Sequence, residues 1–246
     1  MRYFTIATAM TLALSLNAQA EMSFDKNDSL NGVTLKSGKS EAVRAYSGSI
    51  SKHFPFPLEM VKNGITNFSE KCNNDYKGKR EYTSQETDCK YFNEHLVETF
   101  TIKDLKPVDA YKGIEHYLVG RQIYNRGSYT YYELVQVKTS MNEKNQKVMT
   151  ISLEMLNDSE VRAFTEPKFD KDSVFSKSGS TYTLTEVGPS ETHMDYEYHA
   201  ETDHWILNKE ISVPQVFASI SKSINDLMKT VEAESSSQKR ELASHQ

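Results

Sequence analysis

Apolar residues toward the C-terminus recur at steps of three and four, the spacing that aligns them on one face of a helix. This spacing predicts one long helix over residues 213–234, with Ser212 as its N-cap and Pro214 in its first turn. The apolar stripe comprises Val213, Val216, Phe217, Ile220, Ile224, Leu227, Met228 and Val231. The polar residues 235–246 that follow are expected to form a disordered tail.

Apolar and polar residues alternate through most of the middle of the chain, as they do in strands that bury one face. Strands are predicted over residues 41–50, 94–103, 114–124, 128–139, 148–156, 161–165, 181–187 and 192–200. A shorter helix is predicted over residues 58–71, directly after Pro57. Residues 21–40 are mostly polar and contain two glycines, so a flexible lead-in is expected there.

The order of these elements predicts an α+β fold, in which a curved antiparallel sheet grips a long C-terminal helix. The elements form a single predicted domain over residues 41–234. An antiparallel sheet buries one face and can leave the other in water. Any space left between the buried face and the helix would be apolar, which is the usual character of a small-molecule site.

The first 20 residues have the three parts of a secretory signal peptide. Arg2 supplies the positive charge, residues 4–16 form a short apolar segment, and Ala18 and Ala20 match a small-residue cleavage site. The apolar segment is shorter than the roughly 20 residues that a membrane-spanning helix needs. The mature chain is therefore expected to begin at Glu21, to carry no integral membrane segment, and to be periplasmic or secreted.

Cys72 and Cys89 are the two cysteines of the chain. An even number of cysteines in an oxidising compartment usually means a disulfide, and we expect these two to be bonded. The segment between them is polar and would gain from a covalent clip. Their spacing differs from the C-x-x-C pattern of redox pairs, so a structural role is favoured.

Motifs of known catalytic chemistry do not occur in the sequence. It contains no G-x-S-x-G nucleophile elbow, no P-loop and no dinucleotide-binding glycine pattern. The formal net charge of −5 disfavours a general nucleic-acid binder, which usually has a basic surface. We expect neither a cofactor nor a nucleic-acid partner, and we favour binding over catalysis.

Residues of the metal-ligand type gather at one place. His193, Asp195, Glu197 and His199 share one face of the predicted strand 192–200, and His204 lies just beyond it. Zn²⁺ is bound by such side chains, so a metal-dependent hydrolase that uses His193, His199 and His204 is one alternative function. The opposite face carries Met and Tyr, which suits burial, and the His and acidic face is therefore interpreted as the solvated one.

Four tyrosines crowd one predicted hairpin, namely Tyr124, Tyr129, Tyr131 and Tyr132. Aromatic pairs across two strands stabilise hairpins. Exposed tyrosines would instead favour contact with another protein. A cell-envelope interaction module is therefore a second alternative function, and it predicts a contiguous exposed aromatic patch on this hairpin.

Three segments near the C-terminus carry a resemblance to a known superfamily: STYTLTE (180–186), THMDYEY (192–198) and ISVP (211–214). They resemble the last strand pair and the helix of the START and polyketide-cyclase-like (SRPBCC) helix-grip proteins. The resemblance implies a lipid or another hydrophobic small molecule held between helix and sheet. By position it implies a ligand lining of Val216, Phe217, Ile220, Ile224 and Leu227. The same residues would equally fill a closed core, and the sequence leaves both readings open.

Overall fold

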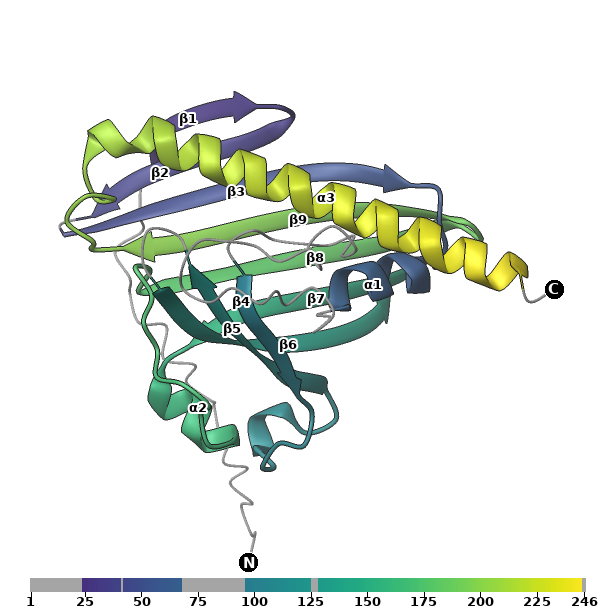
Figure 1. Cartoon of the computed structure of the whole chain (residues 1–246). Helices are drawn as coiled ribbons and strands as arrows, with labels where there is room; N and C mark the ends of the chain where they lie inside the picture. The colour runs from purple at the N-terminus through teal and green to yellow at the C-terminus, as the bar shows by residue number, and fades with distance from the viewer. Residues whose placement is uncertain (1–23, 41, 68–95, 125–127, 245–246) are drawn as a thin grey trace, which may run out of the picture.

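The computed structural model (Figure 1) describes residues 24–40, 42–67, 96–124 and 128–244. Nine strands of these residues form one antiparallel sheet in the spatial order β1-β2-β3-β9-β8-β7-β6-β5-β4. The strands are β1 (Phe24–Leu30), β2 (Val33–Ser40), β3 (Val43–Phe54), β4 (Leu96–Ile102), β5 (Glu115–Tyr124), β6 (Ser128–Met141), β7 (Lys147–Leu156), β8 (Lys177–Gly188) and β9 (Glu191–Thr202). The helices are α1 (Leu58–Thr66), α2 (Asp158–Phe164) and α3 (Val213–Ser244), with 3-10 turns η3 (Asp109–Tyr111) and η4 (Glu210–Ser212).

The long helix α3 lies on one face of the sheet, called the inner face here, and packs on β1, β2, β3 and α1 (Figure 1). Helix α1 packs in turn against β8 and β9. Both helices direct their apolar stripes at the alternate, inward-facing residues of the strands, and these side chains form one buried core. The predicted fold class, a curved antiparallel sheet that grips a long C-terminal helix, is confirmed.

A smaller core lies on the opposite face of the sheet, called the outer face here. Leu118, Tyr132 and Leu134 of β5 and β6 pack there against Val161 and Phe164 of α2. Successive residues of a strand point to opposite faces, so Tyr117 and Val119 belong to the inner core while Leu118 belongs to the outer one. Strands β5 and β6 are therefore buried on both sides.

The residues expected to form a flexible lead-in are instead the hairpin β1–β2. Asn31 and Gly32 make its turn with φ of 51° and 81°, the left-handed conformation that two-residue hairpin loops favour. Ser221 of α3 donates from Oγ to the Leu30 carbonyl oxygen at 2.8 Å, and Val33 and Leu35 are fully buried. The contact with α3, which lies far away in the sequence, fixes this hairpin in place.

The prediction of a strand over residues 161–165 was wrong, because residues 161–164 belong to helix α2 and Thr165 is its C-cap. Asn157 caps the helix: its side-chain oxygen accepts from the Glu160 amide at 3.0 Å, and the Glu160 carboxylate accepts from the Asn157 amide at 2.7 Å. This reciprocal capping box is a strong start signal. Val161 and Phe164 are residue types that suit strands, but their spacing of three would put them on opposite faces of a strand, whereas it puts them on one face of a helix.

The disordered tail expected after residue 234 was also wrong over most of its length, because α3 continues to Ser244. Ser235 is fully buried and donates to the Val231 carbonyl oxygen at 2.8 Å. The predicted helix 58–71 corresponds to α1, which ends at Thr66 with Asn67 as its C-cap. The signal peptide and the disulfide between Cys72 and Cys89 lie outside the described residues.

Candidate functional site

The five α3 residues implied as ligand lining lie against β2 and β3. Val216, Phe217, Ile220 and Ile224 are buried in the inner core, and Leu227 is partly buried beside it. Phe217 meets Tyr46 edge-on, with 6.3 Å between the ring centroids. Ile220 and Ile224 lie directly over Gly48 of β3. These side chains pack against the protein itself in this structure, and a role in lining a ligand site stays a prediction.

A charged pair lies further along the inner face, on the neighbouring strands β5 and β6. The Arg121 Nε and Glu133 Oε2 atoms are 2.8 Å apart, and the two side chains are only 24% and 13% exposed. Arg121 is the cross-strand partner of Tyr131, and Glu133 that of Val119. Strand alternation places all four side chains on the face that carries the apolar core.

Tyrosines of β6, β8 and β9 surround this ion pair. Tyr182 and Tyr196 are cross-strand partners whose ring centroids are 4.7 Å apart. The side chain of Ser180 is close enough to both hydroxyls to lower their pKa. We define the tyrosine cluster as Arg121, Tyr131, Glu133, Ser180, Tyr182, Tyr196 and Tyr198. Its members come from four strands, and the sheet register brings them together.

The tyrosines of this cluster stay protonated at neutral pH. Burial raises the pKa of Tyr131, Tyr182, Tyr196 and Tyr198, and the negative charge of Glu133 raises each of them further. Each hydroxyl can therefore donate one hydrogen bond and accept others. The cluster offers a cation, an anion and neutral hydroxyls within an apolar surface.

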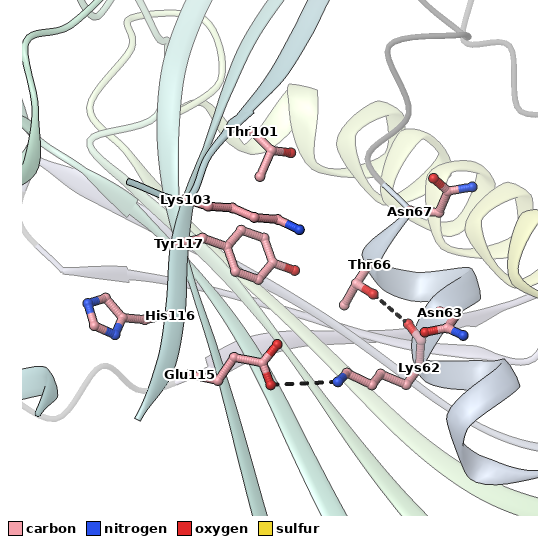
Figure 2. Close-up of a pocket in the computed structure, with 9 residues that line it drawn as sticks. All are labelled: Lys62, Asn63, Thr66, Asn67, Thr101, Lys103, Glu115, His116 and Tyr117. Carbon is pink, nitrogen blue, oxygen red and sulfur yellow. Dashed lines mark hydrogen bonds and ion pairs between the residues drawn. The ribbon is translucent and has the colours of Figure 1, made fainter. Parts of the chain in front are cut away.

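A cleft of about 590 Å³ opens between α1 and the sheet edge formed by β4 and β5 (Figure 2). Its lining consists of Lys62, Asn63, Thr66, Asn67, Thr101, Lys103, Glu115, His116 and Tyr117. Lys62 Nζ lies 3.6 Å from Glu115 Oε2 and bridges the two walls. Lys103 is exposed and has no ion-pair partner among the residues that the structure describes. The cleft is therefore polar, with two lysines at its rim.

Tyr117 connects the polar cleft with the inner face. Its ring points from β5 across the cleft toward α1 (Figure 2). The pKa of Tyr117 is raised to about 12, chiefly by burial and then by the charge of Glu115, while a hydrogen bond with Thr66 opposes the shift. Tyr117 and Arg121 share one face of β5, four residues or about 13 Å apart along the strand.

The histidines proposed as metal ligands do not come together. His193 Nε2 lies 3.2 Å from Asp195 Oδ1, His199 Nε2 lies 3.4 Å from Glu154 Oε2, and His204 Nδ1 accepts from the Ile206 amide. No group of three or more metal-type side chains is placed to hold an ion in the described part of the chain. The face of β9 that carries the histidines and acidic residues is part of the outer face of the sheet. This agrees with the prediction that this face is solvated.

The exposed aromatic patch expected for an interaction module is not formed by the tyrosines that can be placed. Tyr132 is 1% exposed in the outer core, and Tyr131 belongs to the inner tyrosine cluster. Tyr129 is only partly exposed. The side chain of Tyr124 lies outside the described residues. Strand alternation divides this run of tyrosines between the two faces of the sheet.

The Arg121–Glu133 pair was not among the candidate site residues predicted from the sequence. A signal was present, because Glu133 shares its strand face with Tyr131, Val135 and Val137, where a lone carboxylate needs a partner. The partner on β5 follows only from the register between the two strands.

No protein-family profile and no curated protein matches the sequence. Solved structures do match. Human STARD10 superposes with a TM-score of 0.48 at 12% identity, over 94% of this chain and 80% of that chain. Human StAR-related lipid transfer protein 5 gives 0.48 at 11% identity, over 90% and 89% of the two chains. The STAR-related lipid transfer protein from Xanthomonas axonopodis gives 0.45 at 10% identity, over 87% and 98%.

The chain thus resembles START proteins, as its C-terminal segments predict, and at these identities the likeness concerns the fold alone. Among the helices that the structure describes, none is both long enough and apolar enough to cross a membrane.

Proposed function

We propose that the protein binds a lipid or another hydrophobic small molecule that carries a polar group, on the inner face of its sheet. The observation that carries this proposal is the shielded Arg121–Glu133 pair within an apolar surface. Desolvating two charges is expensive, and apolar replacements of a buried pair are often neutral or stabilising. We therefore interpret the shielded pair as a site that recognises a polar group of a ligand.

The surroundings of the pair suit an amphipathic ligand. Tyr131 and Tyr198 are only partly buried and offer apolar contact, which contributes roughly 25 cal/mol for each Å² removed from water. Arg121 would donate to a carboxylate, phosphate or hydroxyl of the ligand. The neutral tyrosine hydroxyls would make the remaining hydrogen bonds of that ligand group. The cleft beside Tyr117 is the proposed entrance, because it reaches from solvent to the same face of β5.

Native mass spectrometry of the mildly purified protein tests this proposal. We expect an added mass that disappears on organic extraction and identifies the ligand class. The Arg121→Met variant should lose most of this added mass, and circular dichroism checks that it is still folded, because Glu133 is left shielded without its partner. Lys147→Met is the matched control. It also replaces a cation by Met and breaks an ion pair, but this pair, with Glu59 at 2.7 Å, is exposed. A bare wild-type protein, or full occupancy in Arg121→Met, would contradict the proposal.

We infer a non-enzymatic role, in which the ligand is held without being converted. Neutral tyrosines with a raised pKa are poor general bases at neutral pH, and Arg121 stays charged. A ligand recovered chemically unchanged after prolonged incubation with the protein supports binding alone. Conversion of the recovered ligand during that incubation would contradict it.

We also propose that the protein works outside the cytoplasm, in the periplasm or after secretion. The apolar residues 4–16, the small residues before Glu21, and the pair of cysteines support this location. The intact mass of the protein from its native cells provides the test. We expect a chain that begins at Glu21 and is two hydrogens lighter than its reduced form. An uncleaved, reduced chain would rule this location out.

A further inference from the structure

Large apolar side chains are exposed together on the loop between β9 and α3. Trp205 is 68% exposed, Ile206 43% and Ile211 88%. We call these three residues the apolar tip. Other large apolar side chains at the surface, such as Met141 and Val187, are not part of this loop, and single exposed ones need no explanation. Three exposed large apolar side chains on one loop of about ten residues form an apolar surface patch, which does need an explanation.

Buried side chains hold this loop in a fixed position. Tyr46 donates from its hydroxyl to the Leu207 carbonyl oxygen at 2.6 Å. Arg44, which is fully buried, donates from Nε to the Asn208 carbonyl oxygen at 3.1 Å. Ser212 donates from Oγ to the Ile206 carbonyl oxygen at 2.8 Å. The fold therefore presents the apolar tip to solvent on anchored backbone, although exposing these side chains contributes nothing to stability.

The charges around the apolar tip are nearly balanced. Glu210 lies 3.5 Å from Lys26 Nζ and 3.7 Å from Arg44 Nη2, so two cations neutralise it. Lys209 Nζ lies 5.3 Å from the centroid of the Trp205 ring. A lysine beside an exposed indole can keep its ammonium group in water while the ring enters an apolar phase. Binding of a partner at the apolar tip would therefore depend on burial of apolar area more than on attraction between opposite charges.

We propose that the apolar tip inserts into the interface of a lipid bilayer and docks the protein there. Tryptophan favours the depth of the lipid headgroups, and isoleucine favours the acyl chains just below. Phe24 adds a fourth exposed apolar side chain at the same end of the molecule, two residues from Lys26, which contacts Glu210. A stable protein interface engages about 20–30 residues on each side, far more than this small projection offers. The proposal goes beyond ligand binding and does not depend on it.

Trp205 is the single tryptophan of the chain, so its fluorescence reports on this loop alone. The protein as purified is mixed with phosphatidylcholine vesicles, and with vesicles that carry bromine on their acyl chains. We expect a blue shift of the emission with both, and quenching with the brominated lipid. The readout stays local to the loop even when another segment, such as residues 4–16, also touches the vesicles.

Two variants separate insertion from general adhesion. Ile211→Ser should lower the vesicle partition coefficient roughly tenfold, the factor that corresponds to withdrawing one isoleucine side chain from an apolar phase. Met141→Ser, which removes an apolar side chain that is 57% exposed elsewhere, should leave the coefficient unchanged. Absence of bromine quenching in the wild-type protein would overturn the proposal. Equal vesicle partition coefficients of Ile211→Ser and wild type would also overturn it. A blue shift of the Trp205 emission with an added protein, but not with vesicles, would do the same.

Discussion

At the scale of single residues, Gly48 decides how closely α3 approaches the sheet. A Cβ atom added at this position would lie 2.8 Å from side-chain carbons of both Ile220 and Ile224. Real Cβ atoms do not approach other atoms so closely, so the helix or the isoleucines must move. Glycine is needed here because of this close approach of strand and helix, not because of an unusual backbone angle.

Gly48→Ala should therefore destabilise the protein by about 1–3 kcal/mol, the usual cost of overpacking a core. Urea denaturation followed by circular dichroism measures the difference. Gly188→Ala is the control, because the nearest atom to its added Cβ is 3.7 Å away, which is ordinary contact. Equal stability of Gly48→Ala and wild type would show that α3 does not pack tightly on β3.

His199 on the outer face provides a pH-dependent contribution to stability. A hydrogen bond with Glu154 raises the pKa of His199 above its ordinary value of 6.5, Glu201 raises it further, and burial and Lys177 oppose the shift. A raised folded-state pKa means that the contribution is present in full below about pH 6.5 and is lost as the pH rises through the folded-state value. The side chains are half exposed, so the effect is modest.

Glu154→Gln should consequently reduce stability near about pH 5.5 and change it little near about pH 9, where His199 is neutral in both proteins. Denaturation at the two pH values measures this, and NMR titration of the imidazole gives its pKa directly. A pKa of 6.5 or below for His199 in the wild-type protein would refute this account.

At the scale of elements, helix α2 shows how a short segment can mislead sequence interpretation. Its apolar residues Val161 and Phe164 are too few to establish a helical period, and both also suit strands. The decisive signal was local, the Asn157 cap followed three residues later by Glu160. The β1–β2 hairpin was missed in the same way, although Asn31 and Gly32 form a favoured hairpin turn.

Asn157→Ala should cost about 1 kcal/mol, because it leaves an amide at the start of α2 without its hydrogen bond. Thermal or urea denaturation gives the value. Asn157→Asp is the control, since it keeps the acceptor oxygen and adds a negative charge at the positive end of the helix dipole. If Asn157→Ala and Asn157→Asp were equally stable, the capping box would not support α2.

At the scale of the whole molecule, the sequence predicts the order of most helices and strands along the chain, but not which strands pair or in which register. Long, strongly periodic segments such as α3, β6 and the β8–β9 hairpin were predicted correctly, because each carries its own pattern. The pairing of β3 with β9, which joins distant parts of the chain, follows from no local pattern. The tyrosine cluster depends on the registers of four successive strand pairs, from β5–β6 to β8–β9, so its pieces were visible in the sequence and its assembly was not.

The sheet joins four strands at the tyrosine cluster, so a ligand held there would stabilise the whole fold rather than one loop. A ligand at about 100 times its dissociation constant adds about 2.7 kcal/mol to the free energy of unfolding. For a chain of this size each kcal/mol raises the midpoint by about 2–4 °C. The protein stripped by organic extraction and refolded should therefore melt several degrees below the protein as purified.

The Arg121→Met variant turns this expectation into a test of the site. Met keeps the length and apolar stem of the arginine but cannot donate to a polar group. It also leaves Glu133 shielded without its partner, so this variant should be less stable than wild type, and the effect of stripping is compared within each variant. Stripping should then change its melting temperature far less than that of wild type, whereas Lys147→Met should respond as wild type does. If stripping lowers the melting temperature of Arg121→Met and wild type equally, the ligand binds elsewhere. The lining of α3 residues implied by the START resemblance, beginning with Phe217, would then become the next place to substitute.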